Sequence, residues 1–196
     1  MSKTEPSSGD GSERVVGRGH HKLAAALDAF GVDPAGWVCA DLGCNVGGFA
    51  GCLLARGAER VYAVDTGYGA LDYQLRRDPR VVVIERTNAM HVRLPEAVDL
   101  VTIDVGWTRQ KHILPAARAM ARPDGRIISL VKPHYETEPR LLRDGVLAAE
   151  QGEPVVELIA STLGEFGLVE LRRTPSPLPG HGGNLEVFLL LAPKPS

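Results

Sequence analysis

The 196-residue sequence contains no apolar run long enough to span a membrane, and its first residues, MSKTEPSSGDGSER, lack the hydrophobic stretch of a signal peptide. These two absences predict a cytoplasmic protein without a membrane partner. Only three cysteines occur, Cys39, Cys44 and Cys52, and none has the C-x-x-C spacing of a zinc or redox site. The six histidines lack ligand-like spacing beyond the adjacent His20–His21 pair, so we expect no metal, haem or flavin.

The sequence also lacks a surplus of basic charge and is poor in aromatic residues. It has 22 Lys and Arg against 24 Asp and Glu, a net charge of -2, and only 5% Phe, Trp and Tyr. Many nucleic-acid-binding proteins are basic because phosphate contacts dominate their affinity, and aromatic rings are the usual platforms for unpaired bases. An RNA ligand would therefore have to be met by a local patch, a partner protein or a further domain.

What the sequence does have is a regular alternation of helix-like and strand-like segments. The polar segment 1–13 is expected to be disordered, and residues 14–196 to form one domain. The expected helices cover residues 20–30, 49–56, 70–77, 111–120 and 155–166. The expected strands cover residues 37–42, 60–64, 81–84, 98–103, 126–131, 168–172 and 185–191. This order predicts an α/β domain with a doubly wound, mostly parallel sheet, and the turn-rich PSPLPGHGG predicts an antiparallel last strand.

A glycine cluster stands between the first strand and the next helix, in VCADLGCNVGGFAGCLL. Ligands of open α/β sheets bind beyond the carboxyl ends of the strands. Gly43 and Gly47 would let the backbone approach a ligand, and the free amides of the helix would attract a carboxylate. The G-x-x-x-G-G spacing differs from the dinucleotide G-x-G-x-x-G, and no G-x-x-x-x-G-K-[ST] of a nucleoside triphosphate site is present.

Polar residues follow the first three strands. Asp65 ends the second strand, where a carboxylate accepts hydrogen bonds from ribose hydroxyls. Asp41 ends the first strand and would lie near a ligand amino group, and Asn88 follows the third strand, where it would lie near an adenine edge. Each residue has an alternative interpretation as a turn or cap residue, and Cys44 as a packing residue. Two acids on successive strands around a glycine loop favour a binding site.

Six segments between Arg18 and Leu191 carry a resemblance to a known family. They are RGHHKLAAALDAFGV, DLGCNVGGFAGCLLARGAERVYAVDTGYG, DPRVVVIERTNA, DLVTIDV, LVKPHYE and NLEVFLLL. Together they resemble the FtsJ-type methyltransferase domain, most closely its TlyA-like (hemolysin A) ribosomal RNA 2′-O-methyltransferases. The resemblance implies a Rossmann-like class I methyltransferase fold with a seven-stranded sheet and S-adenosyl-L-methionine as cofactor. The cofactor contacts expected on this basis are Asp41, Gly43, Asn45, Gly47, Gly48, Phe49, Asp65, Asn88 and Asp104.

Enzymes of that family carry a Lys-Asp-Lys-Glu tetrad, which the resemblance places at Lys22, Asp104, Lys132 and Glu186. A ribose hydroxyl is a poor nucleophile. A lysine accepts its proton only if the lysine pKa falls, as a second lysine and a sulfonium cation would cause. Lys132 is the expected base, and the other three would position it. Taken singly, Lys22 could be solvated, Asp104 a helix cap and Lys132 an exposed strand end, whereas Glu186 on an apolar strand needs a partner.

The substrate contacts are expected around the mouth of the same site. The expected residues are Arg14, Arg18, His20, His21, Trp107, Arg109, Lys111, His134 and Tyr135, with Trp107 and Tyr135 as stacking platforms. TlyA-like proteins carry a small RNA-binding domain before the methyltransferase domain, and here about 13 polar residues stand in its place. We therefore expect a bare catalytic domain whose RNA recognition comes from a ribosomal subunit or a partner protein. The loop GCNVGG and the pair Gly106–Trp107 depart from the family pattern of GASTGG or GAAPGG and Ser-Phe.

Three functions are compatible with these features. The first is a 2′-O-methyltransferase of ribosomal or transfer RNA. The second is an O-methyltransferase of a small hydroxylated or nucleoside-like metabolite, which the near-neutral charge favours. The third is a non-catalytic binding module of the same fold, against which the intact tetrad argues. The sequence favours the first.

Overall fold

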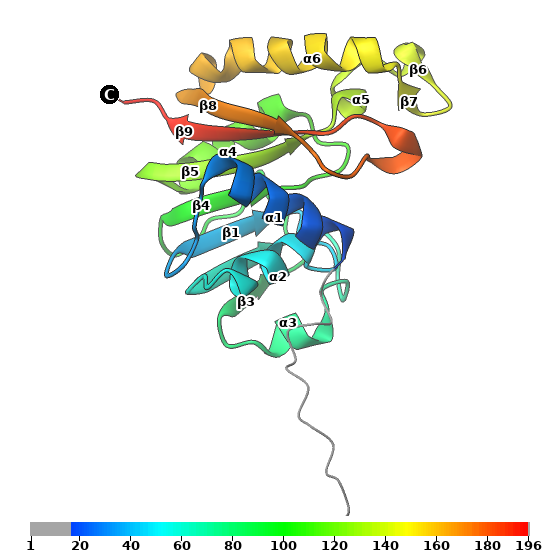
Figure 1. Cartoon of the computed structure of the whole chain (residues 1–196). Coiled ribbons are helices and arrows are strands. Elements are labelled where there is room, and N and C mark those ends of the chain that lie inside the picture. Colours follow the sequence, from blue (N-terminus) through cyan, green and yellow to red (C-terminus); the bar gives the residue numbers. More distant parts are fainter. Residues whose placement is uncertain (1–16, 196) are drawn as a thin grey trace, which may run out of the picture.

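The computed structural model describes residues 17–195 as a seven-stranded sheet between two layers of helices (Figure 1). The predicted disordered segment 1–13 and the expected RNA contact Arg14 lie outside the described residues. The strand order is β3-β2-β1-β4-β5-β9-β8. The strands are β1 (Val38–Leu42), β2 (Arg60–Val64), β3 (Val81–Ile84), β4 (Val98–Ile103), β5 (Ala121–Val131), β8 (Leu168–Pro175) and β9 (Val187–Pro193).

The direction of the strands confirms the predicted sheet. Strands β1 to β5 pair in parallel, whereas β9 runs antiparallel to both of its neighbours, β5 and β8. From β1 the chain moves outward through β2 to β3 and then returns to the other side of β1 with β4. This reversal between β1 and β4 is a switch point, beyond whose carboxyl ends such sheets bind their ligands.

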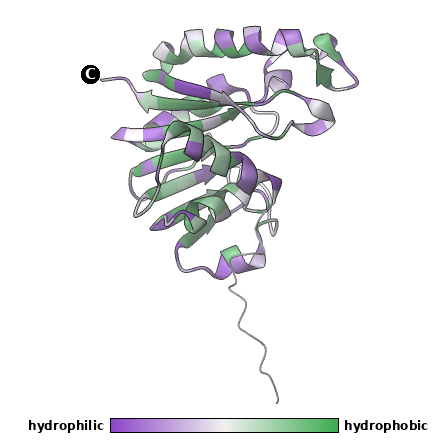
Figure 2. Cartoon of the chain, viewed as in Figure 1, coloured by the Kyte–Doolittle hydropathy of each residue, from purple (hydrophilic) through white to green (hydrophobic). Residues whose placement is uncertain are grey.

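The helices divide between the two faces of the sheet and bury it completely at its centre. They are α1 (Arg18–Phe30), α2 (Gly48–Ala55), α3 (Tyr73–Arg77), α4 (Gln110–Met120), α5 (Pro133–Glu136) and α6 (Ala149–Thr162). One core cluster joins α1, α2 and α3 to the sheet, and the other joins α4 and α6 to its opposite face. All five residues of β1 and all seven of β9 are buried, as expected of strands covered on both sides. Figure 2 shows mostly apolar strands in the middle of the fold and mixed polar and apolar residues along α6.

Local sequence explains where these elements begin and end. Helix α1 stops at Gly31, whose left-handed backbone (φ +67°) lets the amides of Gly31 and Val32 donate to the carbonyls of Asp28 and Leu27. Among the described residues, no helix is long and apolar enough to cross a membrane. No group of three or more His, Cys, Asp or Glu side chains within residues 17–195 is placed to hold a metal ion.

Three features between β5 and β8 differ from the sequence prediction. Pro133 starts the short helix α5 directly after Lys132, because proline suits the first helical turn. A two-stranded hairpin, β6 (Leu142–Arg143) and β7 (Val146–Leu147), turns at Asp144–Gly145, both with positive φ. This Asp-Gly turn is a standard hairpin signal. Helix α6 begins at Ala149, six residues before the predicted start, because it accommodates Pro154 within its second turn.

Candidate functional site

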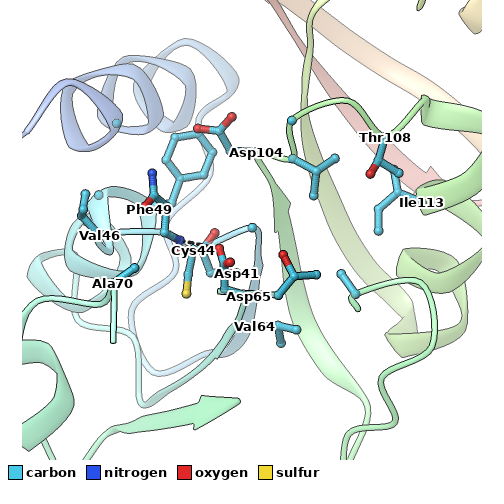
Figure 3. A pocket seen from close by; sticks show the side chains of 18 of the residues that line it. Asp41, Cys44, Val46, Phe49, Val64, Asp65, Ala70, Asp104, Thr108 and Ile113 are labelled. Carbon is cyan, nitrogen blue, oxygen red and sulfur yellow. Dashed lines mark hydrogen bonds between the residues drawn. The ribbon is translucent and has the colours of Figure 1, made fainter. Parts of the chain in front are cut away.

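A cleft of about 980 Å³ lies at the carboxyl ends of the central strands, beside the switch point (Figure 3). In Figure 3, Asp41, Asp65 and Asp104, which follow or end three different strands, lie around it. Many of the residues expected from the sequence line this one cleft. They are Arg18, Lys22, Asp41, Gly43, Asn45, Gly48, Phe49, Asp65, Asn88, Asp104, Trp107 and Lys132. Side chains that are far apart in the sequence, such as those of Lys22 and Lys132, are thus brought to one site.

The glycines of the loop after β1 are required by close approaches of the backbone. Gly43 has φ +84°, and a Cβ atom there would lie 2.5 Å from the carbonyl oxygen of Asp104. A Cβ on Gly48 would lie 3.0 Å from Cα of Gly19, so two glycines allow the first turns of α1 and α2 to touch. The same contact holds the start of α1, which carries Lys22, against the glycine loop. Gly47 packs against α3, where a Cβ atom would lie 2.2 Å from Cδ1 of Leu75. Gly47 does not line the cleft.

Asp41 is fully buried and is engaged by the protein itself. Its Oδ2 accepts a hydrogen bond from the amide of Ala50 in the first turn of α2 (2.9 Å), and its Oδ1 accepts one from the hydroxyl of Thr102 (3.0 Å). Burial raises the pKa of this carboxyl to about 7. Asp41 therefore holds the start of α2 in place beneath the loop, and any ligand group would share a carboxyl that already has two partners.

Asp65 organises the loop from the next strand. Its Oδ2 accepts a hydrogen bond from the amide of Asn45 (2.8 Å) and its Oδ1 one from the amide of Gly67 (2.7 Å). The bond from the amide of Asn45 holds this residue in its left-handed conformation, with φ +46°. The exposed Asn88 accepts a bond from the amide of Met90 (2.9 Å), so it does cap a turn while it also lines the cleft.

The four residues of the expected tetrad form two ion pairs. Nζ of Lys22 lies 2.5 Å from Oε2 of Glu186, and the side chains are only 10% and 4% exposed. Nζ of Lys132 lies 2.5 Å from Oδ1 of Asp104 and 3.5 Å from the carbonyl oxygen of Val105. Both lysines line the cleft, whereas Glu186 stands behind Lys22 and does not. Each lysine thus has its own carboxylate.

Aromatic side chains surround the Lys132 side of the cleft. The Trp107 side chain is 82% exposed, and its ring centre lies 5.5 Å from that of Tyr135, which in turn lies 4.1 Å from the ring of His134. Nζ of Lys132 is 5.9 Å from the centre of the Tyr135 ring. Burial lowers the pKa of His134, with Lys132 and His181 adding to the effect. Tyr135 packs against Trp107 and His134 against Tyr135, and neither Tyr135 nor His134 lines the cleft.

Of the other expected substrate contacts, Arg18 lines the cleft, whereas His20, His21, Arg109 and Lys111 do not. His20 faces His21 with ring centres 6.0 Å apart, and burial lowers the pKa of its imidazole. Arg109 donates to the carbonyl of Thr137 at 3.4 Å, and Lys111 is exposed. Arg18 lines the cleft and donates to the carbonyl of Pro179 at 2.6 Å.

Several lining residues were missed by the sequence interpretation. They are Val46, Thr66, Ala70, Asp72, Thr87, Met90 and Thr108. Most stand one or two positions from a predicted residue at a strand end, and that proximity is the signal that could have identified them. Cys44 also lines the cleft, but it is 5% exposed and burial raises the pKa of its thiol, in keeping with a packing residue.

Comparison with known proteins gives consistent matches. The FtsJ-like methyltransferase family matches residues 15–192. The 16S/23S rRNA (cytidine-2′-O)-methyltransferase TlyA of Mycobacterium tuberculosis is 43% identical over 197 aligned positions, covering 92% of this chain and 69% of that protein. Hemolysin A of Brachyspira hyodysenteriae is 33% identical over 183 positions, covering 88% and 75%. A solved Streptococcus thermophilus structure described as a hemolysin has a TM-score of 0.89 at 30% identity, covering 96% of this chain and 70% of that one.

Proposed function

The chain belongs to the FtsJ-like methyltransferase family, and on that premise we propose that it methylates a 2′-hydroxyl of RNA with S-adenosylmethionine as the methyl donor. One observation carries the proposal: two lysines, each paired with its own carboxylate, line one cleft beside a glycine loop. A ribose hydroxyl needs such a polar, pre-oriented site because it is a weak nucleophile.

The cleft residues fit the proposed cofactor. Gly43 has no room for a side chain, and Asp65, which lines the cleft, accepts one hydrogen bond from the glycine loop at Asn45 and one from Gly67 in its own loop. The volume of about 980 Å³ is ample for a nucleoside-sized ligand together with part of a substrate. We assign Asp65 to the ribose hydroxyls, Asn88 to the adenine edge, and Asp41 with the loop 43–49 to the methionine end. When bound, the cofactor would supply an electrophilic methyl group on a sulfonium.

In this proposal, the chain's own residues orient the acceptor and take its proton. Lys132 contacts the 2′-hydroxyl with Nζ as a free amine, and this nitrogen takes the hydroxyl proton as the oxygen gains the methyl group. Asp104 and the carbonyl of Val105 hold that nitrogen in place, at 2.5 and 3.5 Å. Lys22 presents its ammonium group to the cleft and is held in place by Glu186. Fixed alignment of this kind contributes much of the rate in reactions between two bound partners.

The RNA acceptor is supported by the aromatic residues at the mouth and by the relative from Mycobacterium tuberculosis, whose name specifies 16S and 23S rRNA. Trp107 offers an exposed ring on which an unpaired base can stack, which contributes about 1–3 kcal/mol per base. Trp107→Ala should therefore raise KM for RNA by about 5- to 150-fold while leaving the melting temperature unchanged. An unchanged KM would remove Trp107 from the substrate site.

Transfer of radiolabelled methyl groups into separate acceptor pools tests the proposal. Total RNA, intact ribosomal subunits and a small-molecule extract are incubated with wild type, Lys132→Met and the matched control Lys194→Met. Lys194 is an exposed lysine at the opposite end of the sheet, after β9. Label should enter RNA or subunits with wild type and the control but not with Lys132→Met. Label confined to small molecules would instead support a metabolite O-methyltransferase, and equal labelling by all three proteins would contradict the role of Lys132.

A further inference from the structure

Glu136 connects the two loops that carry the Lys132–Asp104 pair. It is the last residue of α5, four positions after Lys132, and its Oε1 accepts a hydrogen bond of 2.7 Å from the backbone amide of Gln110. Gln110 is the first residue of α4, six positions after Asp104. The carboxylate thus joins the segment that follows β5 to the segment that follows β4.

The hydrogen bond to Glu136 caps the start of α4, which has no capping side chain of its own. The cap residue of α4, Arg109, makes no side-chain capping bond, and the first turn of α4 contains no acidic residue. A helix begins with unpaired amides and a partial positive charge, which a carboxylate stabilises. Glu136 provides both the acceptor and the negative charge from a neighbouring element. Its carboxyl is half-buried, and burial raises its pKa, while the Gln110 amide and the nearby Arg109 and Lys111 act in the opposite direction.

A further hydrogen bond holds Gln110 through its side chain. The hydroxyl of Ser129 in β5 donates to Oε1 of Gln110 at 2.7 Å, and both side chains are buried. Gln110 is therefore held by β5 through its side chain and by α5 through its amide. At the other end of the loop, the amide of Asp104 donates to the carbonyl of Leu42 at 3.0 Å.

Between these two anchors the chain is strained. Trp107 has φ +56°, a left-handed conformation that costs a non-glycine residue on the order of 1–3 kcal/mol and persists only where the surroundings impose it. The ring of Trp107 lies 5.5 Å from that of Tyr135, so the two loops also meet at the aromatic mouth. Release of the Gln110 anchor would let the Trp107 loop relax.

We propose that Glu136 is a positioning residue, which clamps the start of α4 to α5 and thereby sets both the Trp107 loop and the alignment of Lys132 with Asp104. The proposal rests on the proposed methyl transfer, to which it adds a residue that does not line the cleft. Misplacement of reacting groups by about 1 Å costs on the order of 100-fold in rate. Glu136→Ala should therefore lower kcat about 10- to 100-fold, with Kd for S-adenosylmethionine unchanged, because the loops after β1 and β2 are not part of the clamp. Glu136→Gln keeps the acceptor oxygen and should recover most of the rate.

Asp99 provides a matched control at the opposite end of the sheet. Its Oδ2 also accepts a backbone hydrogen bond from a neighbouring element, the amide of Val38, at 2.9 Å. Asp99→Ala should lower stability but leave kcat within about twofold. Equal losses of kcat in Asp99→Ala and Glu136→Ala would mean that both act only through stability, and the proposal would be wrong.

A second readout does not depend on methyl transfer. The chain has two tryptophans, so 5-fluorotryptophan labelling gives one ¹⁹F resonance for Trp107 and an internal reference from Trp37, which precedes β1. The Trp107 resonance should shift or broaden in Glu136→Ala and stay near its wild-type position in Glu136→Gln, while that of Trp37 stays constant in both. If Glu136→Ala does not fold, Glu136→Asp, which withdraws the oxygen by one methylene, takes its place. An unmoved Trp107 resonance in the folded variant would overturn the clamp. Absence of methyl transfer by wild type would refute the proposed function, and the fluorine spectra would still decide the clamp.

Discussion

Removal of Lys22 should destabilise the fold far more than removal of an ordinary lysine. In Lys22→Met, the carboxylate of Glu186 would keep its position with a side chain only 4% exposed and would lose its partner at 2.5 Å. Breaking a buried pair on one side leaves an uncompensated charge, at a cost of about 3–5 kcal/mol. Since domains of this size have about 5–15 kcal/mol in total, the loss is large.

The double variant Lys22→Met/Glu186→Leu tests whether that loss comes from the unpaired charge. Replacement of both members of a buried pair by apolar residues of similar volume is often neutral, so the double variant should lie within about 1 kcal/mol of wild type. The exposed pair Arg140–Glu138, with side chains 78% and 61% exposed, is the control. Arg140→Met should leave the unfolding midpoint unchanged, because solvent screens such pairs.

Urea unfolding at pH 7, followed by circular dichroism, measures these differences. The expected order is wild type, Arg140→Met and the double variant close together, with Lys22→Met well below them. A Lys22→Met variant as stable as wild type would refute the buried pair. A double variant as unstable as Lys22→Met would show that packing of the lysine, and not the charge of Glu186, is responsible. Activity of a Lys22 variant should therefore be compared with wild type only where urea unfolding shows that the variant is folded.

Three further predictions address the cleft. Asp65→Ala should weaken S-adenosylmethionine binding at least tenfold in calorimetry, because two loop amides lose their acceptor, and an unchanged Kd would place Asp65 outside the binding site. Gly43→Ala should abolish cofactor binding because its Cβ would lie 2.5 Å from a backbone oxygen, whereas Gly36→Ala, also at positive φ but with open space, should cost only on the order of 1 kcal/mol in unfolding free energy. Equal effects of the two substitutions would contradict the close approach. For pH, the folded-state pKa of Asp41 is raised to about 7 from 3.8, so the folded protein holds the extra proton and its stability falls as pH rises between about 4 and 7. Asp41→Asn should flatten that part of the stability profile, and parallel profiles for wild type and variant would show that Asp41 does not titrate there.

The order of elements was predictable because buried strands and amphipathic helices leave distinct patterns. Seven strands, the antiparallel last strand and the stop of α1 at Gly31 all follow from local sequence. The hairpin at Asp144–Gly145 was missed although it carries a turn signal, because its strands of two residues each are too short to show alternation. The early start of α6 was missed: the expected helix begins at residue 155, whereas the observed helix begins at Ala149 and contains Pro154.

The sequence predicted many of the residues that line the cleft, but not which of them form pairs. The glycine loop and the acids at strand ends identify the cleft, and resemblance identifies the four residues of the proposed tetrad. Which lysine faces which carboxylate depends on separations of 164 and 28 residues, which only the fold brings to 2.5 Å. The clamp by Glu136 was not predictable for the same reason: the helix that it caps belongs to another segment, so no local capping pattern exists.

Mass spectrometry of nucleosides from methylated RNA tests the central claim most directly. Ribosomal subunits treated with wild type and S-adenosylmethionine, then digested completely, should contain a 2′-O-methylated nucleoside that is absent after treatment with Lys132→Met and present after treatment with Lys194→Met. A methyl group on the base instead of the ribose, or methylated ribose formed equally by Lys132→Met, would contradict the account.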